Sequence, residues 1–227
     1  MNKHLLIGCS FTDPLWQTDI PWSIHYSKVC PSYIVAKAGM GIKGICTEAQ
    51  YYLQNLENID KAIIMLPTMW RLDIEIDEES VYSNCMLDLL YSHEDYKIHT
   101  PAIRKWLTSG GLNYPKNKSE YKIFDLMYKQ QGFKVIAKEH LNALKILLNS
   151  LRERKIQYYI TAICDPLDQL QGLDYIKSEF CNLLNDVEYN SWIRFDGKFI
   201  DKFLKHSNHP STEEHQLLCQ YLINSTT

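Results

Sequence analysis

Short apolar runs alternate with longer segments of helical periodicity along most of this 227-residue chain. Such alternation is typical of a parallel sheet covered by helices. The short runs are almost continuously apolar, which suits strands that are buried on both faces. The pattern therefore predicts a three-layer α/β/α fold with a central parallel sheet of about five strands. The expected strands are residues 4–9, 33–38, 61–66, 157–163 and 191–195, and the expected helices are residues 45–56, 133–154, 173–184 and 211–223.

The alternation fails over residues 72–131, a stretch too long for a plain loop. We expect a mostly helical insertion here, packed over one end of the sheet either as a cap or lid or as a structural elaboration. Asp73, Glu75 and Asp77 alternate at strand spacing, and we interpret them as a solvated edge or loop. The predicted organisation is one α/β domain over residues 1–227 with this insertion.

The composition excludes several classes of function. With 24 Lys and Arg against 27 Asp and Glu, the formal net charge is −3, and the basic residues are spread along the chain. This argues against a nucleic-acid partner. No apolar run approaches the roughly 20 residues of a membrane-spanning helix, and the apolar start is too short for a secretory signal. The seven cysteines form no C-x-x-C pair, so we expect reduced thiols and a cytoplasmic location. The oligomeric state is left open.

Ser10 follows the first expected strand, where ligands bind in open parallel sheets. A serine at such a turn can hold its Oγ outward and aim its own N–H at a developing oxyanion. The segment Gly8-Cys9-Ser10-Phe11-Thr12 is not a G-x-S-x-G elbow, because Thr12 replaces the second glycine. The alternative interpretation is an ordinary serine at a helix start.

Gly39, Gly41 and Gly44 follow the second expected strand and open a helix. Such a turn exposes backbone N–H groups, which can stabilise an oxyanion or a phosphate. The spacing matches G-x-G-x-x-G, but a dinucleotide fingerprint belongs after the first strand, and Asp60 precedes the next strand instead of following it. We therefore discount NAD and predict no cofactor.

His209 and Pro210 precede the last expected helix, whose start carries a capping box of Ser211 and Glu214. A histidine held in that loop can act as a general base. Taken alone, a single loop histidine is more typical of a solvent-exposed residue. The order of Ser10, the glycine turn and His209 carries more information than any one of them.

Three histidines, His206, His209 and His215, form the pattern H-x-x-H-x5-H, which is reminiscent of zinc ligands. Pro210 and the capping box interrupt the segment, so the first two histidines do not share a helical face. We predict no metal.

The order of a serine after the first strand, a glycine-rich turn after the second and His-Pro before the last helix resembles the SGNH (GDSL-like) hydrolase family. The resemblance spans most of the chain and leaves the middle insertion outside it. It implies a flavodoxin-like α/β fold and an activity among esterases, lipases, carbohydrate acyl or deacetyl hydrolases and some acyltransferases. By this resemblance, Ser10 matches the nucleophile, Gly39 the oxyanion-hole glycine and His209 the catalytic base.

One departure from the family pattern concerns the oxyanion hole. The third block of the family reads Gly-x-Asn-Asp, with the Asn side chain as an oxyanion donor. Met69 occupies that place here and cannot donate a hydrogen bond. Thr68 or Arg71 could substitute, and an arginine at this strand end could instead hold an anionic substrate.

A second departure concerns the acid that precedes the family's histidine by three residues. His206 occupies that position. An acid there fixes the imidazole tautomer and stabilises its charged form, although some catalysis survives its loss. Asp196, Asp201 or a backbone carbonyl could accept the Nδ1–H of His209 instead.

These residues favour an enzyme, a serine-dependent carboxylic ester hydrolase with a Ser–His dyad or a rescued triad. The expected substrate is a small or carbohydrate-linked acyl ester, and the 15 tyrosines modestly favour a polar ligand over a long lipid tail. Met69 and His206 favour the alternative of a catalytically inactive binding or structural module with the same scaffold. A carbohydrate O-acyltransferase is the close chemical variant.

Overall fold

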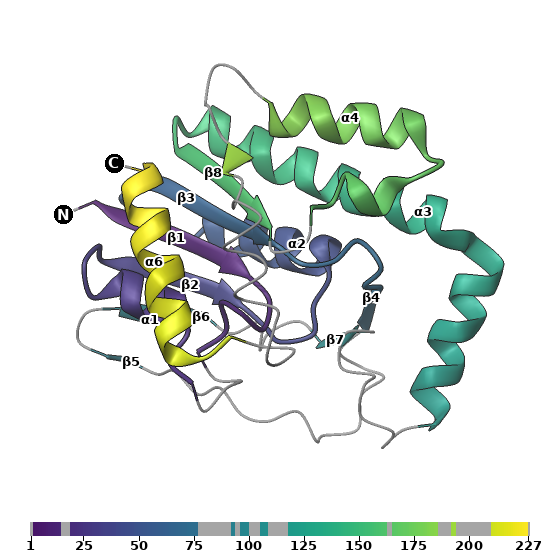
Figure 1. Ribbon diagram of the computed structural model, residues 1–227, viewed down its shortest axis with the longest axis horizontal. Helices are drawn as coiled ribbons and strands as arrows, with labels where there is room; N and C mark the ends of the chain where they lie inside the picture. Colours follow the sequence, from purple (N-terminus) through teal and green to yellow (C-terminus); the bar gives the residue numbers. More distant parts are fainter. Residues whose placement is uncertain are drawn as a thin grey trace.

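The computed structural model describes residues 2–14, 19–76, 92–93, 96–99, 105–108, 118–162, 165–185, 192–193 and 210–226. A β-sheet lies between two layers of helices (Figure 1). This confirms the predicted three-layer α/β/α fold. The elements are β1 (Lys3–Gly8), α1 (Trp22–Ser27), β2 (Ser32–Ala36), α2 (Ile42–Leu53), β3 (Ile59–Leu66), β4 (Asp73–Ile76), β5 (Ser92–His93), β6 (Tyr96–His99), β7 (Lys105–Thr108), α3 (Lys118–Glu153), β8 (Gln157–Ala162), the 3₁₀ helix η3 (Asp168–Leu170), α4 (Asp174–Leu184), β9 (Trp192–Ile193) and α6 (Thr212–Thr226).

Four parallel strands in the order β2-β1-β3-β8 form the centre of the sheet. Ile7 of β1 pairs with Val35 of β2 and with Ile64 of β3, so the turns after these three strands meet at one edge. The centre of the sheet thus has four strands and not about five: of the fifth predicted strand, residues 191–195, the structure describes Trp192–Ile193, which form the short β9 parallel to β8. At the other edge, the short β6 pairs in parallel with β2, and β5 pairs antiparallel with β6.

Each face of the sheet buries its own apolar cluster. The first cluster joins the sheet to α2, α3 and α4, and includes Leu5 and Leu144. The second joins the sheet to α1 and α6, and includes Leu6, Trp22 and Leu218. Leu5 and Leu6 are neighbours in β1 yet belong to opposite clusters, as the alternation of side chains along a strand requires. Burial on both faces explains why the strands read as nearly continuous apolar runs.

The four expected helices correspond to α2, the second half of α3, α4 and α6. Helix α3 is divided at Gly132, whose backbone has φ 70° and ψ 160°, and Figure 1 shows the chain bending within α3. Helix α1 was not predicted, because six residues are too few to display a helical apolar face. Among the described helices, none has both the length and the apolar character to span a membrane.

The segment 72–131, expected to be a mostly helical insertion, contains both helix and short strands among its described residues. The four short strands β4 to β7, which were not predicted, precede Lys118, and the described residues from Lys118 onward belong to α3. β4 and β7 pair antiparallel in a sheet of their own, while β6 joins the free edge of β2. Such pairings join residues that are distant in sequence, so local periodicity does not reveal them.

Candidate active site

Ser10 lies in the turn that follows β1. The N–H groups of Thr12 and Asp13 both donate to the Cys9 carbonyl oxygen, at 2.8 and 2.9 Å. Ser10 is buried, and its Oγ donates to the Cys9 Sγ at 4.0 Å. Residues 10–12 and 14 lie in turns. The structure therefore puts Ser10 directly beyond the carboxyl end of a central strand.

The side chains of α1 hold the Ser10 turn from one side. The Trp22 Nε1–H donates to the Thr12 Oγ1 at 3.2 Å, and the Ser23 Oγ donates to the Thr12 carbonyl oxygen at 2.6 Å. Thr12, Trp22 and Ser23 are all fully buried. The turn is thus fixed by buried hydrogen bonds two residues away from Ser10.

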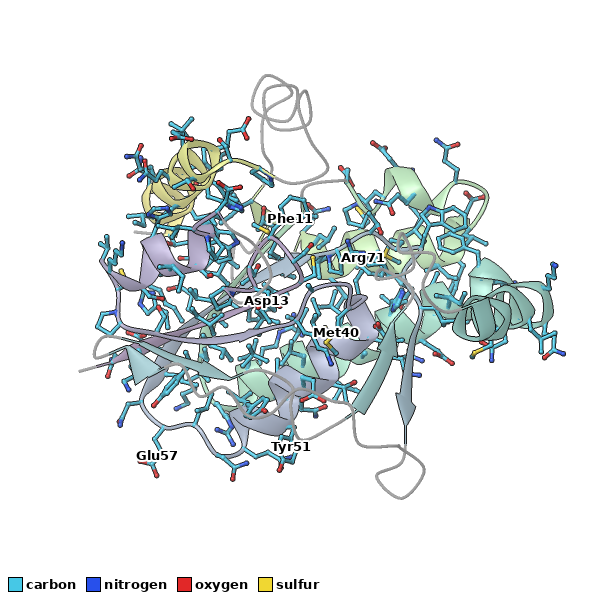
Figure 2. The ribbon with its side chains drawn as sticks, turned by 90° about the horizontal axis from the view of Figure 1, so that it is seen from below. Phe11, Asp13, Met40, Tyr51, Glu57 and Arg71 are labelled. Carbon is cyan, nitrogen blue, oxygen red and sulfur yellow. The ribbon has the colours of Figure 1, made fainter. Side chains whose placement is uncertain are left out.

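Asp13 connects the Ser10 turn to the turn that follows β2. Its Oδ2 accepts a hydrogen bond from the Ala38 N–H at 2.8 Å, and Figure 2 shows Asp13 and Met40 in the same part of the molecule. The Met40 N–H donates to the Lys37 carbonyl oxygen at 3.3 Å, and Gly39 has φ 84°. A β-turn with positive φ at its third residue is the type II turn, which favours glycine there. Ser10 and Gly39 therefore lie on adjoining, linked turns.

The amide of Gly39 differs from those around it. The N–H of Ala38 donates to Asp13, that of Met40 to Lys37, and that of Gly41 to Asp73. Gly39 is buried, and its N–H has no hydrogen-bond acceptor among the described residues. Because a buried N–H group in a native protein nearly always has a partner, this amide is suited to an oxygen atom of a bound ligand.

Gly41 and Gly44 do not offer their amides to a ligand, as the glycine-rich spacing suggested, but to a side chain of this chain. The Asp73 carboxylate accepts from the Gly41 N–H at 2.8 and 3.0 Å and from the Gly44 N–H at 2.9 Å. A Cβ atom on Gly41 or Gly44 would lie 2.7 or 3.0 Å from the Asp73 Oδ2. The start of α2 already holds an anion, so these two amides are not exposed for a phosphate. The interpretation of Asp73 as a solvated residue is also wrong, since it is 2% exposed.

His140 completes the capping of α2. The Lys43 N–H donates to the His140 Nδ1 at 3.1 Å, and the His140 Nε2–H donates to the Arg71 carbonyl oxygen at 2.7 Å. These two contacts require a neutral imidazole with its proton on Nε2. Asp73 and His140 together satisfy amides in the first turn of α2, where no earlier carbonyl of the helix is available.

Burial moves the pKa values of Asp73 and His140 in opposite directions. It raises the pKa of Asp73 to about 6, although the N–H groups of Gly41 and Gly44 and the charges of Arg71 and Lys43 favour the ionised form. Burial lowers the pKa of His140 to about 4, against the smaller effect of its bond to Arg71. Both shifts follow from the cost of a charge away from water.

These shifts predict opposite contributions to stability between about pH 4 and pH 6.5. The folded chain keeps a proton on Asp73 that the unfolded chain has lost, so this contribution rises as the pH falls. The unfolded chain binds a proton on His140 that the folded chain does not bind, so the contribution of His140 to stability falls as the pH falls. Relative to the wild type, we expect Asp73→Asn to lose stability on acidification and His140→Gln to gain it. Urea unfolding across this range tests the prediction, and parallel profiles for the two variants would contradict it.

The loop after β3 contributes Met69, Trp70 and Arg71. Met69 is buried, and its N–H donates to the Gln169 Oε1 at 2.8 Å. Trp70 is 52% exposed and stacks on Phe133, with ring centroids 3.7 Å apart. The Arg71 Nη1 donates to the Met40 carbonyl oxygen at 3.2 Å. Of the two predicted substitutes for an oxyanion donor, Arg71 reaches the glycine turn through a hydrogen bond, whereas Thr68 offers its backbone oxygen to the Arg71 N–H.

The start of α6 carries the predicted capping box. The Ser211 N–H donates to the Glu214 carboxylate at 2.7 Å, and the Glu214 N–H donates to the Ser211 Oγ at 3.3 Å. His215 is buried, and its ring lies edge-on to that of Phe11 with centroids 6.5 Å apart. The first turn of α6 therefore packs beside the Ser10 turn. The remaining predicted site residues, Asp196, Asp201, His206 and His209, lie outside the described residues.

Two solved structures resemble this one over nearly their whole length. A protein described as lipolytic and of the G-D-S-L family, from Desulfitobacterium hafniense DCB-2, is 11% identical with a TM-score of 0.51, over 99% of each chain. The chain has the SGNH fold. A second structure with this fold, the psychrotrophic esterase EstA from Pseudoalteromonas sp., is 10% identical with a TM-score of 0.52, over 100% of this chain and 97% of that one. No family model matches the sequence, and the search of curated proteins finds no match. The SGNH fold confirms the resemblance that the motif order indicated.

Three residues that the sequence analysis did not assign to the site hold it together. They are Asp13, Asp73 and His140. For His140 a signal existed, because it is a polar residue within the apolar face of the predicted helix 133–154. For Asp73 the signal was indirect: two glycines three residues apart at a helix start allow the close approach of an acceptor.

Proposed function

We propose that this chain is a serine esterase that hydrolyses a small or carbohydrate-linked acyl ester. The observation that carries the proposal is the Gly39 N–H, which is buried, has no acceptor among the described residues and lies in a turn that Asp13 links to the Ser10 turn. An unengaged amide next to a serine at a strand end is the arrangement that acyl transfer needs. The SGNH fold adds support, because the esterase EstA shares it.

In the proposed reaction, the Ser10 Oγ attacks the ester carbonyl carbon while His209 takes the hydroxyl proton. The carbonyl oxygen becomes an oxyanion that accepts hydrogen bonds from the Ser10 and Gly39 amides. Collapse of this intermediate expels the alcohol, which receives the proton from His209. Water then attacks the acyl-enzyme in the same way and releases the carboxylic acid.

The packing of α6 supports the role of His209. Thr212 accepts from the Ile20 N–H at 3.3 Å and donates to the Asp19 carboxylate at 3.0 Å, while His215 packs against Phe11. His209 precedes Thr212 by three residues, a span of at most about 11 Å. His209 itself lies outside the described residues, and the proposal for it rests on the place of α6 beside the Ser10 turn. We propose Asp196 or Asp201 as the partner of its Nδ1–H, since His206 occupies the family's acid position.

The exposed ring of Trp70 favours a carbohydrate-linked ester over a long lipid. Phe133 stacks on one side of the indole and holds it, while 52% of Trp70 is exposed. A fixed aromatic face of this kind packs well against the C–H face of a sugar ring. We propose that residues 72–131, which follow this loop, form the inserted cap of a single domain. Transfer of the acyl group to a sugar hydroxyl would use the same acyl-enzyme with a different acceptor.

The test is covalent labelling with a neutral fluorophosphonate, read by intact mass. The phosphorus takes the place of the ester carbon, the Ser10 Oγ–P bond forms, and fluoride leaves with the proton of the hydroxyl. We expect one adduct on the wild type, mapped to Ser10 by peptide mass. The adduct should be absent in Ser10→Ala and should form roughly 10²–10⁴ times more slowly in His209→Ala, since a general base contributes that much.

Folding controls separate chemistry from stability in this test. Thermal unfolding of both variants should match the wild type, because the Ser10 hydroxyl is small and its replacement leaves the backbone hydrogen bonds of the turn in place. Absence of an adduct on folded wild-type protein would count against hydrolysis and in favour of an inactive binding module. An adduct on another serine would contradict the assignment of Ser10.

A further inference from the structure

We propose that the Arg71 guanidinium is a third donor of the oxyanion hole and supplies the contact that Met69 cannot make. This inference rests on the proposed function, since it assigns a catalytic role within the same site. It means that a cation, and not a neutral amide, faces the developing oxyanion beside the Gly39 turn.

Met69 is excluded as a donor by two observations. Its thioether has no hydrogen to donate, and its side chain is fully buried. Its backbone N–H is already engaged, because it donates to the Gln169 Oε1 at 2.8 Å. A third donor from this loop must therefore come from another residue.

Arg71 is held against the glycine turn at both ends of the residue. Its N–H donates to the Thr68 carbonyl oxygen at 3.3 Å, and its own carbonyl oxygen accepts from the His140 Nε2–H at 2.7 Å. At the other end, the Nη1 donates to the Met40 carbonyl oxygen at 3.2 Å. Met40 directly follows Gly39, so the guanidinium contacts the residue after the one whose amide is unengaged. Figure 2 shows Arg71 and Met40 close to each other, with Asp13 in the same region.

The guanidinium keeps both charge and donors for a ligand. It has five N–H groups, and among the described residues Met40 is its one hydrogen-bond acceptor. Within that same part of the chain, no carboxylate lies at ion-pairing distance from Arg71. Asp73, two residues on in the chain, directs its oxygens to the Gly41 and Gly44 amides. Asp73 thus shares the site with Arg71 without forming a direct ion pair that would occupy its donors.

The chemistry follows from this placement. When the Ser10 Oγ–carbon bond forms, the carbonyl π electrons move onto oxygen and the hydroxyl proton passes to His209. The oxyanion then accepts from the Gly39 N–H and from a guanidinium N–H. A charge-assisted hydrogen bond of this type is stronger than one from a neutral amide, and it strengthens as the negative charge develops. When the intermediate collapses, the electrons return to the carbonyl and the alcohol leaves with the proton from His209.

The rate of Ser10 labelling by the neutral fluorophosphonate measures this contact, because the phosphoryl oxygen occupies the oxyanion position. We expect Arg71→Gln to label roughly 10²–10³ times more slowly than the wild type, as for loss of one oxyanion donor. Arg71→Lys should retain part of the rate, and free guanidinium at a low, non-denaturing concentration should partly restore Arg71→Ala. The matched control is Arg154→Gln, since the exposed Arg154 also donates to a backbone carbonyl, that of Leu53 at the far end of α2.

The outcomes distinguish this inference from the function on which it rests. If wild-type Ser10 is labelled but Arg71→Gln labels at the same rate, the inference is overturned and the esterase proposal stands. If, in addition, Arg71→Gln raises the KM for anionic esters but not for neutral ones, Arg71 binds the anionic group of the substrate instead. If the wild type is not labelled, the esterase proposal fails, and the inference fails with it. If Arg71→Gln does not fold, the labelling rate of Arg71→Lys decides. If Arg71→Lys labels Ser10 as fast as the wild type and Arg154→Gln do, a role that depends on the planar guanidinium is overturned.

Discussion

Replacement of Asp73 by alanine is expected to lower the free energy of unfolding by about 3 kcal/mol. The Asp73 carboxylate is buried and accepts from the N–H groups of Gly41 and Gly44, at 2.8 to 3.0 Å. Alanine would leave both amides buried and without an acceptor, at about 1–3 kcal/mol each. The variant also no longer buries a charge, and this gain offsets part of the loss. We therefore expect a value in the lower half of the range for the two amides together.

Urea unfolding at neutral pH measures this effect, with Glu57→Ala as the matched control. Glu57 is an exposed acidic residue beyond the end of α2, far from the glycine turn (Figure 2). Its replacement should change the free energy of unfolding by less than about 0.5 kcal/mol. Equal stabilities for Asp73→Ala and Glu57→Ala would show that water satisfies the Gly41 and Gly44 amides, and would contradict the capping role of Asp73.

Replacement of Trp22 by alanine is expected to cost about 3–5 kcal/mol, the usual loss for a large aromatic side chain in a core. Trp22 is the first residue of α1 and is fully buried in the cluster that joins α1 to the sheet and α6. Its ring lies edge-on to that of Tyr26, with centroids 6.1 Å apart. Its Nε1–H also donates to Thr12 in the Ser10 turn. The cavity and the lost hydrogen bond therefore act on the same turn, and the labelling rate of Ser10 should fall as well.

Two further tryptophan variants test this explanation. Trp22→Phe keeps most of the ring but loses the bond to Thr12, so its cost should be well below that of alanine. Trp70→Ala removes an exposed ring that stacks on Phe133 and should cost about 0.5–1.5 kcal/mol. Thermal and urea unfolding provide the measurements. A loss for Trp22→Ala no larger than that for Trp70→Ala would contradict the role of Trp22 in the core.

Asp73, His140 and Arg71 together explain an unusual use of the glycine-rich turn. A helix start with several exposed amides attracts an anion, and here an internal carboxylate and an imidazole occupy the amides of Gly41, Lys43 and Gly44. Of the other amides from Ala38 to Gly44, those of Gly39 and Ile42 have no acceptor among the described residues. With the Gly41, Lys43 and Gly44 amides occupied, few donors are left at the helix start for a phosphate, and the Gly39 N–H ahead of the helix is suited to a single oxygen atom.

The sequence by itself determined the layered architecture and the order of the main motifs. Strands β1, β2, β3 and β8 are recognisable because burial on both faces demands apolar residues throughout. The start of α6 is recognisable because a capping box involves residues only three positions apart, Ser211 and Glu214. The place of Ser10 and Gly39 at neighbouring strand ends follows from the parallel order alone. Each of these features depends on local patterning.

Only the tertiary structure decided which groups surround the candidate site. Asp73 reaches Gly41 across 32 positions, His140 reaches Arg71 across 69, and His140 reaches Lys43 across 97. The pairing of β6 with β2, in the segment where helices were expected, also joins residues far apart in sequence. Such contacts leave no periodic trace, because a single buried acceptor or one edge pairing requires a particular approach of two segments and not a repeated pattern. The choice between Thr68 and Arg71 at the glycine turn was of this kind, since it depends on which side chain the folded loop directs to the Met40 carbonyl oxygen.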